Sequence, residues 1–132
     1  MNILEKIKYI VEGTGFNTNI EDDTIKNTFF RKVLFTADNL QLVVMAIDAG
    51  EAIGTEIHKE SDQFIRIEKG KGKATIGNRT FDIEDGSAFI IPRGTRHQVT
   101  NTGEDQLKLY AIYAVPHHPP NRVDKEKPVE AD

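Results

Sequence analysis

Residues 63–91, QFIRIEKGKGKATIGNRTFDIEDGSAFII, decide the fold class of this chain. Along residues 63–69 the side chains alternate between two faces, one of which is mostly apolar, as in a half-buried β-strand. The pair Gly77-Asn78 separates two further strand-like runs and is a two-residue hairpin signal. Glycines at both ends of residues 70–72 mark another tight turn. Short strands joined by tight turns predict an all-β architecture.

The same alternation of strands and turns extends outward, so we expect one β-domain over residues 29–115. A chain of 132 residues suits a single hydrophobic core. Residues 1–28 are predicted to be an N-terminal adaptor segment, helical or extended, whose acidic stretch 21–23 forms a solvated turn. Residues 116–132 hold four of the five prolines and are predicted to be a polar tail that lies along the barrel or stays mobile. Within the first segment apolar residues at near-helical spacing predict one short helix ending at the glycines: Leu4, Ile7, Ile10, Val11, then Gly13 and Gly15.

Composition excludes several classes of protein. The formal net charge is −4, which argues against a nucleic-acid partner because no strong positive field is present. The absence of cysteine excludes disulfides and thiolate metal ligands. Apolar runs are far too short to cross a bilayer, so no membrane partner is expected. The N-terminus lacks the uninterrupted apolar centre of a signal peptide, and we therefore expect a cytoplasmic location.

Four side chains are candidates for one metal site. Glu56 and His58 are two residues apart and leave the same face of a strand, and Gln63 opens the next strand. His97 follows the turn signal at residues 92–94. If these strands share a barrel interior, two imidazoles, a carboxylate and a carboxamide oxygen converge there. Such a set suits Mn, Fe, Co, Ni or Zn, and four ligands with an open position disfavour a closed tetrahedral zinc site.

Other polar side chains have alternative interpretations. Glu60 offers a second carboxylate, although it lies in an expected turn. His117 and His118 lie in the proline-rich tail, where a metal role is less expected and folding over the mouth of a pocket is the alternative. Tyr110 and Tyr113 share the last long strand and are three residues apart, so only one of them faces inward. That tyrosine serves either as a general acid or as a packed residue of the core.

The spacing of the candidate ligands resembles both signature motifs of the cupin superfamily. The second motif matches at every defining position, and the first departs at two ligands. Glu56 stands where the family usually has its first histidine, and Gln63 stands where it usually has a glutamate. In the first motif, five residues separate Gly50 from Glu56, one separates Glu56 from His58, four separate His58 from Gln63, and six separate Gln63 from Gly70. In the second motif, five residues separate Gly86 from Pro92, one separates Pro92 from Gly94, two separate Gly94 from His97, and three separate His97 from Asn101.

This resemblance implies a small antiparallel double-stranded β-helix, a jelly-roll-like barrel with its metal site inside the mouth. It also implies a homodimer, in which residues 1–35 pack across the interface. We predict a metal-dependent enzyme acting on a small oxygenated metabolite, a sugar or sugar acid, by isomerase- or lyase-like Lewis-acid chemistry. Glu56 is the expected catalytic residue, either as a ligand or as a base that detaches.

Two alternatives remain at this point. The first is an iron-dependent dioxygenase, because two histidines and one carboxylate satisfy the facial pattern used for oxygen activation. The second is a non-catalytic module that binds a small ligand. Recognition of an anionic substrate needs an inward cation; Arg93 and Arg96 flank His97, but Arg96 is expected to point the opposite way.

Overall fold

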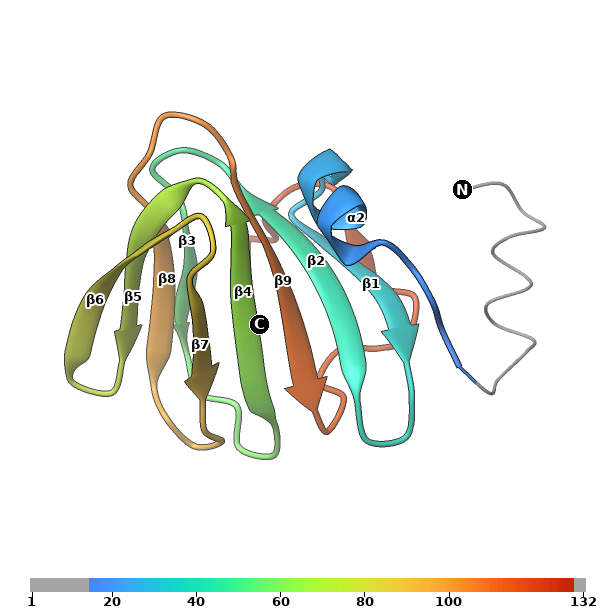
Figure 1. Ribbon diagram of the computed structural model, residues 1–132. Helices are drawn as coiled ribbons and strands as arrows, with labels where there is room; N and C mark the ends of the chain where they lie inside the picture. The colour runs from blue at the N-terminus through green and yellow to red at the C-terminus, as the bar shows by residue number, and fades with distance from the viewer. Residues whose placement is uncertain (1–14, 130–132) are drawn as a thin grey trace.

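The computed structural model describes residues 15–129, which form two antiparallel β-sheets facing each other and one short helix (Figure 1). The six-stranded sheet has the order β10-β1-β2-β9-β4-β7, and the four-stranded sheet has the order β3-β8-β5-β6. The predicted all-β, antiparallel, jelly-roll-like architecture is therefore confirmed. The elements are α2 (Ile20–Lys26), β1 (Arg31–Thr36), β2 (Gln41–Ile47), β3 (Ala52–Glu56), β4 (Asp62–Lys69), β5 (Lys71–Ile76), β6 (Arg79–Glu84), β7 (Ala88–Ile91), β8 (His97–Asn101), β9 (Leu107–Ala114) and β10 (Val123–Asp124).

The core lies between the two sheets and is built from alternate side chains of each strand. In β4 the buried side chains are Gln63, Ile65 and Ile67, as the alternation predicted. In β8 the buried set begins with His97 and continues with Val99. The apolar residues of each set join one core cluster, while the polar residue at the start of each strand lies at one end of it. Because side chains alternate along each strand, Gln63 and His97 face the same interior as the apolar residues that follow them.

The hairpin between β5 and β6 turns at Gly77-Asn78, as predicted. Gly77 has a φ of +61°, and Asn78 follows it without a positive φ. A glycine at the first central position is the requirement of a type II′ turn, whose twist matches that of the flanking strands. The turn sets the register in which Ile76 lies opposite Arg79.

The acidic stretch 21–23 was predicted to be a solvated turn, and this prediction is wrong. These residues form the first turn of helix α2. The Asn19 side chain caps the helix by accepting a hydrogen bond from the Asp22 amide at 3.0 Å. Three carboxylates beside the helix N-terminus also interact favourably with the helix dipole. The helix predicted from Leu4 onward lies outside the described residues.

The C-terminal tail was predicted either to lie along the barrel or to stay mobile. As far as β10, it lies along the barrel. β10 pairs with β1, so that Arg31 lies opposite Asp124. The buried Arg31 guanidinium forms an ion pair with Asp124, with 2.6 Å between Nη1 and Oδ2. The boundaries assigned at residues 28 and 115 remain predictions. Within the described part of the chain, no helix is long and apolar enough to cross a membrane.

Candidate metal centre

Glu56, His58 and His97 form a buried cluster at one end of the two sheets. One ligand atom of each residue lies within 4.8 Å of the others, and the Glu56 Oε2 and His58 Nε2 atoms are 3.6 Å apart. The three residues are only 6%, 5% and 3% exposed, respectively. Buried carboxylates and imidazoles are costly unless they are paired or coordinate a cation. The cluster therefore has the composition and the spacing of a metal-binding site.

Two strands and one connection position these three side chains. Glu56 ends β3 and lies opposite His97, which begins β8. His58 was expected on the same strand as Glu56, but it lies in the connection between β3 and β4. The His58 carbonyl accepts a hydrogen bond from the Gly94 amide at 2.7 Å. This bond ties the connection to the turn before β8, so both motifs meet at the same end of the sheets.

His97 is held in an orientation that suits a metal ligand. Its Nδ1 atom lies 2.9 Å from the carbonyl oxygen of Thr95, which only accepts hydrogen bonds. Nδ1 therefore carries the ring proton, and Nε2 presents its lone pair to the cluster. Burial lowers the pKa of His97, and the bond to Thr95 raises it to a smaller extent. The lowered pKa favours the neutral ring, which is the form that binds a metal.

Gln63 lies beside this cluster and has one amide oxygen available. It begins the buried face of β4, and its Nε2 atom donates to the Tyr113 hydroxyl at 3.0 Å. Its Oε1 atom is buried and has no hydrogen-bond partner among the described residues. An unsatisfied buried acceptor costs about 1–3 kcal/mol. A cation bound beside the cluster would satisfy this oxygen.

Tyr113 is the inward tyrosine of β9, and Tyr110 lies on the opposite face. The Tyr113 ring meets the His58 ring edge-on, with 5.7 Å between the centroids. Its hydroxyl accepts the hydrogen bond from Gln63, which fixes its position beside the candidate cluster. Of the two tyrosines considered from the sequence, Tyr113 is therefore the one available to the site.

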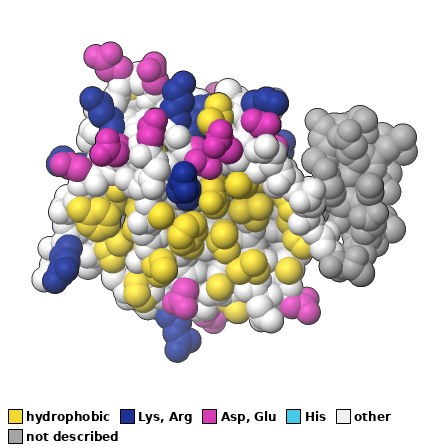
Figure 2. Space-filling model, in the orientation of Figure 1, with side chains coloured by type: hydrophobic (Ala, Val, Ile, Leu, Met, Phe, Trp, Pro, Cys, Tyr) yellow, Lys and Arg dark blue, Asp and Glu magenta, His cyan; other side chains and the backbone are white. Residues whose placement is uncertain are grey.

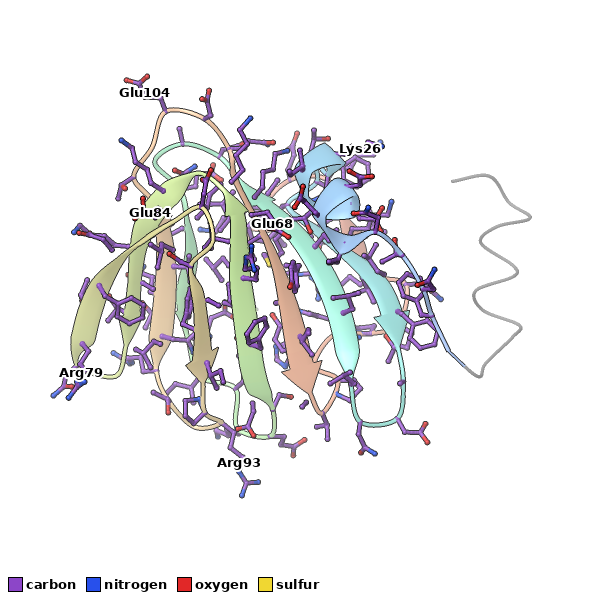
Figure 3. The ribbon with its side chains drawn as sticks, in the orientation of Figure 1. Lys26, Glu68, Arg79, Glu84, Arg93 and Glu104 are labelled. Carbon is purple, nitrogen blue, oxygen red and sulfur yellow. The ribbon has the colours of Figure 1, made fainter. Side chains whose placement is uncertain are left out.

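Three other charged residues considered from the sequence lie outside the cluster. Glu60 is exposed, so Glu56 is the carboxylate that joins the two histidines. Arg93 and Arg96 are also exposed, and Arg93 extends away from the sheets (Figure 3). These two arginines therefore supply no buried cation for an anionic substrate.

A surface depression lies at the opposite end of the sheets and shares no residue with the cluster. Lys71, Glu84 and Glu104 are among the residues that line it, and the two glutamates project outward (Figure 3). Its glutamates are solvent-exposed, and no imidazole lines it. Exposed acidic groups are common on protein surfaces. The buried cluster is therefore the candidate metal centre.

His117 and His118, for which a metal role was less expected from the sequence, lie beside the candidate cluster. The His117 ring centroid lies 4.0 Å from that of His58 and 5.4 Å from that of Tyr113. His118 is buried, and its Nε2 atom lies 3.4 Å from the Tyr113 hydroxyl oxygen. The segment has no strand periodicity, so its sequence carries no signal for this inward position. The one available signal was that two of the four histidines lie here.

Comparison with known proteins gives the family. The family model described as "Cupin domain" matches residues 43–113, more than half of the chain. This chain belongs to the cupin family. The match contains the whole candidate cluster and both motifs, so the resemblance predicted from the sequence is confirmed.

This cupin is similar to two uncharacterised proteins, one bacterial and one viral, and to a bacterial crystal structure. The uncharacterised protein YrkC of Bacillus subtilis is 43% identical over 118 residues, which cover 85% of this chain and 63% of YrkC. An uncharacterised protein of Acanthamoeba polyphaga mimivirus is 40% identical over 114 residues, covering 83% of this chain and 71% of the viral protein. A crystal structure from Bacillus halodurans superposes with a TM-score of 0.82 at 46% identity, covering 84% of this chain and 89% of that one. This cupin thus spans less than two thirds of the length of YrkC.

The side chains of the candidate cluster in this cupin fit a bound divalent metal ion. The fit rests on the 4.8 Å cluster, the Nε2 lone pair of His97 and the available Oε1 atom of Gln63. Nitrogen and oxygen donors of this kind suit divalent Mn, Fe, Co, Ni and Zn. The predicted ligands Glu56, His58 and His97 are brought together, and Gln63 lies on the adjoining buried face.

Proposed function

We propose that this cupin binds a divalent metal through Glu56, His58, Gln63 and His97, and acts as a metal-dependent enzyme on a small oxygenated metabolite. The observation that carries the proposal is the buried cluster whose ligand atoms lie within 4.8 Å. When bound, the metal would polarise a carbonyl or hydroxyl oxygen of the substrate as a Lewis acid. A sugar or sugar acid, with adjacent oxygens, is the substrate class that this chemistry favours.

The residues of the chain supply the rest of the proposed chemistry. Glu56 is the buried carboxylate of the cluster and serves as a ligand or, when detached, as a proton acceptor. Tyr113 is held by the Gln63 amide and keeps its hydroxyl at the site, where it can hold a proton. Both groups are buried, which limits water and strengthens electrostatic interactions. Isomerase- and lyase-like reactions move a proton of the substrate, and these two groups are placed to accept or hold it.

Metal content tests the first part of this proposal. Protein purified without a histidine tag should contain one equivalent of a divalent metal by elemental analysis. The His58→Ala variant should lose it, because one imidazole donor is removed. Gln98→Ala is the matched control, since Gln98 neighbours His97 but is directed to the other face of β8. Equal metal content in the His58→Ala variant and the wild type would refute the site.

A second candidate function is supported by the composition of the cluster. Glu56, His58 and His97 form a two-histidine, one-carboxylate set, which is the pattern of non-haem iron oxygenases. Iron in the purified protein, together with substrate-dependent oxygen uptake, would favour this function. Turnover under anaerobic conditions without oxygen consumption would favour the Lewis-acid function instead.

The homodimer implied by the resemblance, for which residues 1–35 were the expected interface, belongs to the same proposal. β1 is paired on both sides within the chain, by β2 and β10, which leaves the outer face of the six-stranded sheet as the candidate contact. Apolar side chains gather on this face (Figure 2), where Ile90 on β7 is 64% exposed. An isologous contact between two copies would remove this surface from water. Sedimentation velocity of the wild type and of Ile90→Lys tests this, with a dimer expected only for the wild type.

A further inference from the structure

All four histidines of the chain gather in one place. Two come from the family motifs, and two come from the segment after β9. The ring centroids of His58 are 4.8 Å from those of His97 and 4.0 Å from those of His117. The rings of His117 and His118 are 4.6 Å apart. Imidazole is the protein side chain that borderline divalent metals most often bind, so this gathering points to a nitrogen-rich site.

A buried glutamine fixes the segment that carries the two additional histidines. We call residues 115–118 the C-terminal strap. The Gln41 side chain, fully buried on β2, accepts hydrogen bonds through Oε1 from the amides of His117 at 3.0 Å and His118 at 2.9 Å. Its Nε2 atom donates to the His118 carbonyl at 2.7 Å. The same Nε2 atom also donates to the Thr36 hydroxyl at 2.9 Å. A buried amide that makes three hydrogen bonds to the backbone of two consecutive residues holds them in one geometry.

This clamp brings the His117 ring against His58, one of the candidate ligands. The ring is closer to His58 than the His97 ring is, and it stacks on Tyr113 with an interplanar angle of 29°. His117 is only partly buried, so its ring lies between the buried cluster and the solvent. The strap therefore closes the site with an imidazole and not with an apolar side chain.

We propose that His117 is an additional nitrogen ligand of the metal, so that the C-terminal strap completes the site with a third imidazole. The inference rests on the proposed metal-binding function. With His117 the site has three imidazoles, although Glu56 occupies a position where the first motif usually has a histidine. The strap supplies the third ring from a segment that the two motifs do not contain.

His118 has a different place in this arrangement. Its ring meets Tyr113 edge-on, at 5.2 Å and 89°, and its Nε2 atom faces the Tyr113 hydroxyl. Tyr113 in turn accepts from Gln63. Of the two strap histidines, His118 therefore contacts Tyr113 through its Nε2 atom, and His117 contacts the His58 ring.

Cobalt binding tests the inference, because Co²⁺ in an N/O site gives a visible spectrum that depends on its ligands. Metal-free wild-type protein and the His117→Phe variant are titrated with CoCl₂. Phenylalanine keeps an aromatic ring against Tyr113 and His58 but has no donor atom. We expect His117→Phe to weaken Co²⁺ binding by more than about tenfold and to shift the visible bands. An affinity and spectrum equal to those of the wild type would overturn the inference.

A measurement on the wild type does not depend on the folding of a variant. In the Co²⁺-loaded protein, each ligating imidazole gives a strongly shifted exchangeable N–H proton resonance, and the inference expects three. Two such resonances would mean that only His58 and His97 ligate, which overturns the role of His117 and leaves the proposed function standing. Co²⁺ binding that is unaffected in the His58→Ala variant would instead refute the proposed function itself.

Discussion

Gly72 lies where β5 runs against the backbone of β8, and this position has no room for a side chain. A Cβ atom added there would be 2.1 Å from the carbonyl oxygen of Thr100, a backbone atom fixed by the sheet. We expect Gly72→Ala to lower the free energy of unfolding by about 3 kcal/mol, measured by urea denaturation. Gly15→Ala is the control, because nothing lies within 4 Å of its added Cβ. Equal losses in both variants would contradict the steric explanation.

Asn101 closes the second motif for a structural reason. Its Nδ2 atom donates to the carbonyls of Ile47 and Asp105, each at 2.8 Å, and its Oδ1 atom accepts from the Gly103 amide at 2.8 Å. Asn101→Ala would leave these groups unpaired next to the core. We therefore expect a loss of about 2–3 kcal/mol in urea denaturation. Thr102→Ala, at an exposed neighbouring position, should stay close to the wild type.

At the scale of elements, helix α2 depends on its N-cap. Asn19→Ala removes the side chain that accepts from the Asp22 amide, and we expect a loss of about 1 kcal/mol in the free energy of unfolding. Asn17→Ala is the control, because it makes the same substitution two residues earlier, at an exposed position outside the helix. A loss at Asn17 as large as that at Asn19 would show that capping is not the cause.

The strands could be predicted from the sequence, whereas α2 and the strap could not. Alternation in β4 and the turn signal at residues 92–94 are local patterns, and they placed Gln63 and His97 inside correctly. The acidic turn of α2 is ambiguous, because aspartates favour both loops and helix N-termini. His117 is placed by contacts with β2 that are more than seventy residues away in the sequence, and no local pattern reports such a contact.

The C-terminal strap should be released when its clamp is removed. Gln41→Met keeps much of the buried volume but loses the three hydrogen bonds to the strap backbone. We expect amide hydrogen exchange at His117 and His118 to become faster, while exchange in the centre of β9 stays slow. Exchange measured by NMR checks this. Unchanged protection of both strap amides would show that Gln41 does not hold them.

At the scale of the whole molecule, the two ends of the sheets differ in chemistry. One end gathers the four histidines with Glu56, Gln63 and Tyr113. The other end carries exposed carboxylates, among them Glu84 and Glu104 (Figure 3). Because the candidate ligands come from both sheets and from the connection between β3 and β4, a metal bound among them would connect parts of the chain that are distant in sequence.

Such a metal must stabilise the whole fold, because the unfolded chain does not hold these donors together. At a free metal concentration about 100-fold above its Kd, binding adds about 2.7 kcal/mol to the free energy of unfolding. For a domain of this size, that corresponds to a rise in Tm on the order of 10 °C, measured with metal and then with excess chelator. His97→Ala should lose the metal-dependent rise, and Gln98→Ala should keep it. A rise of equal size in the His97→Ala variant would place the stabilising metal somewhere other than this cluster.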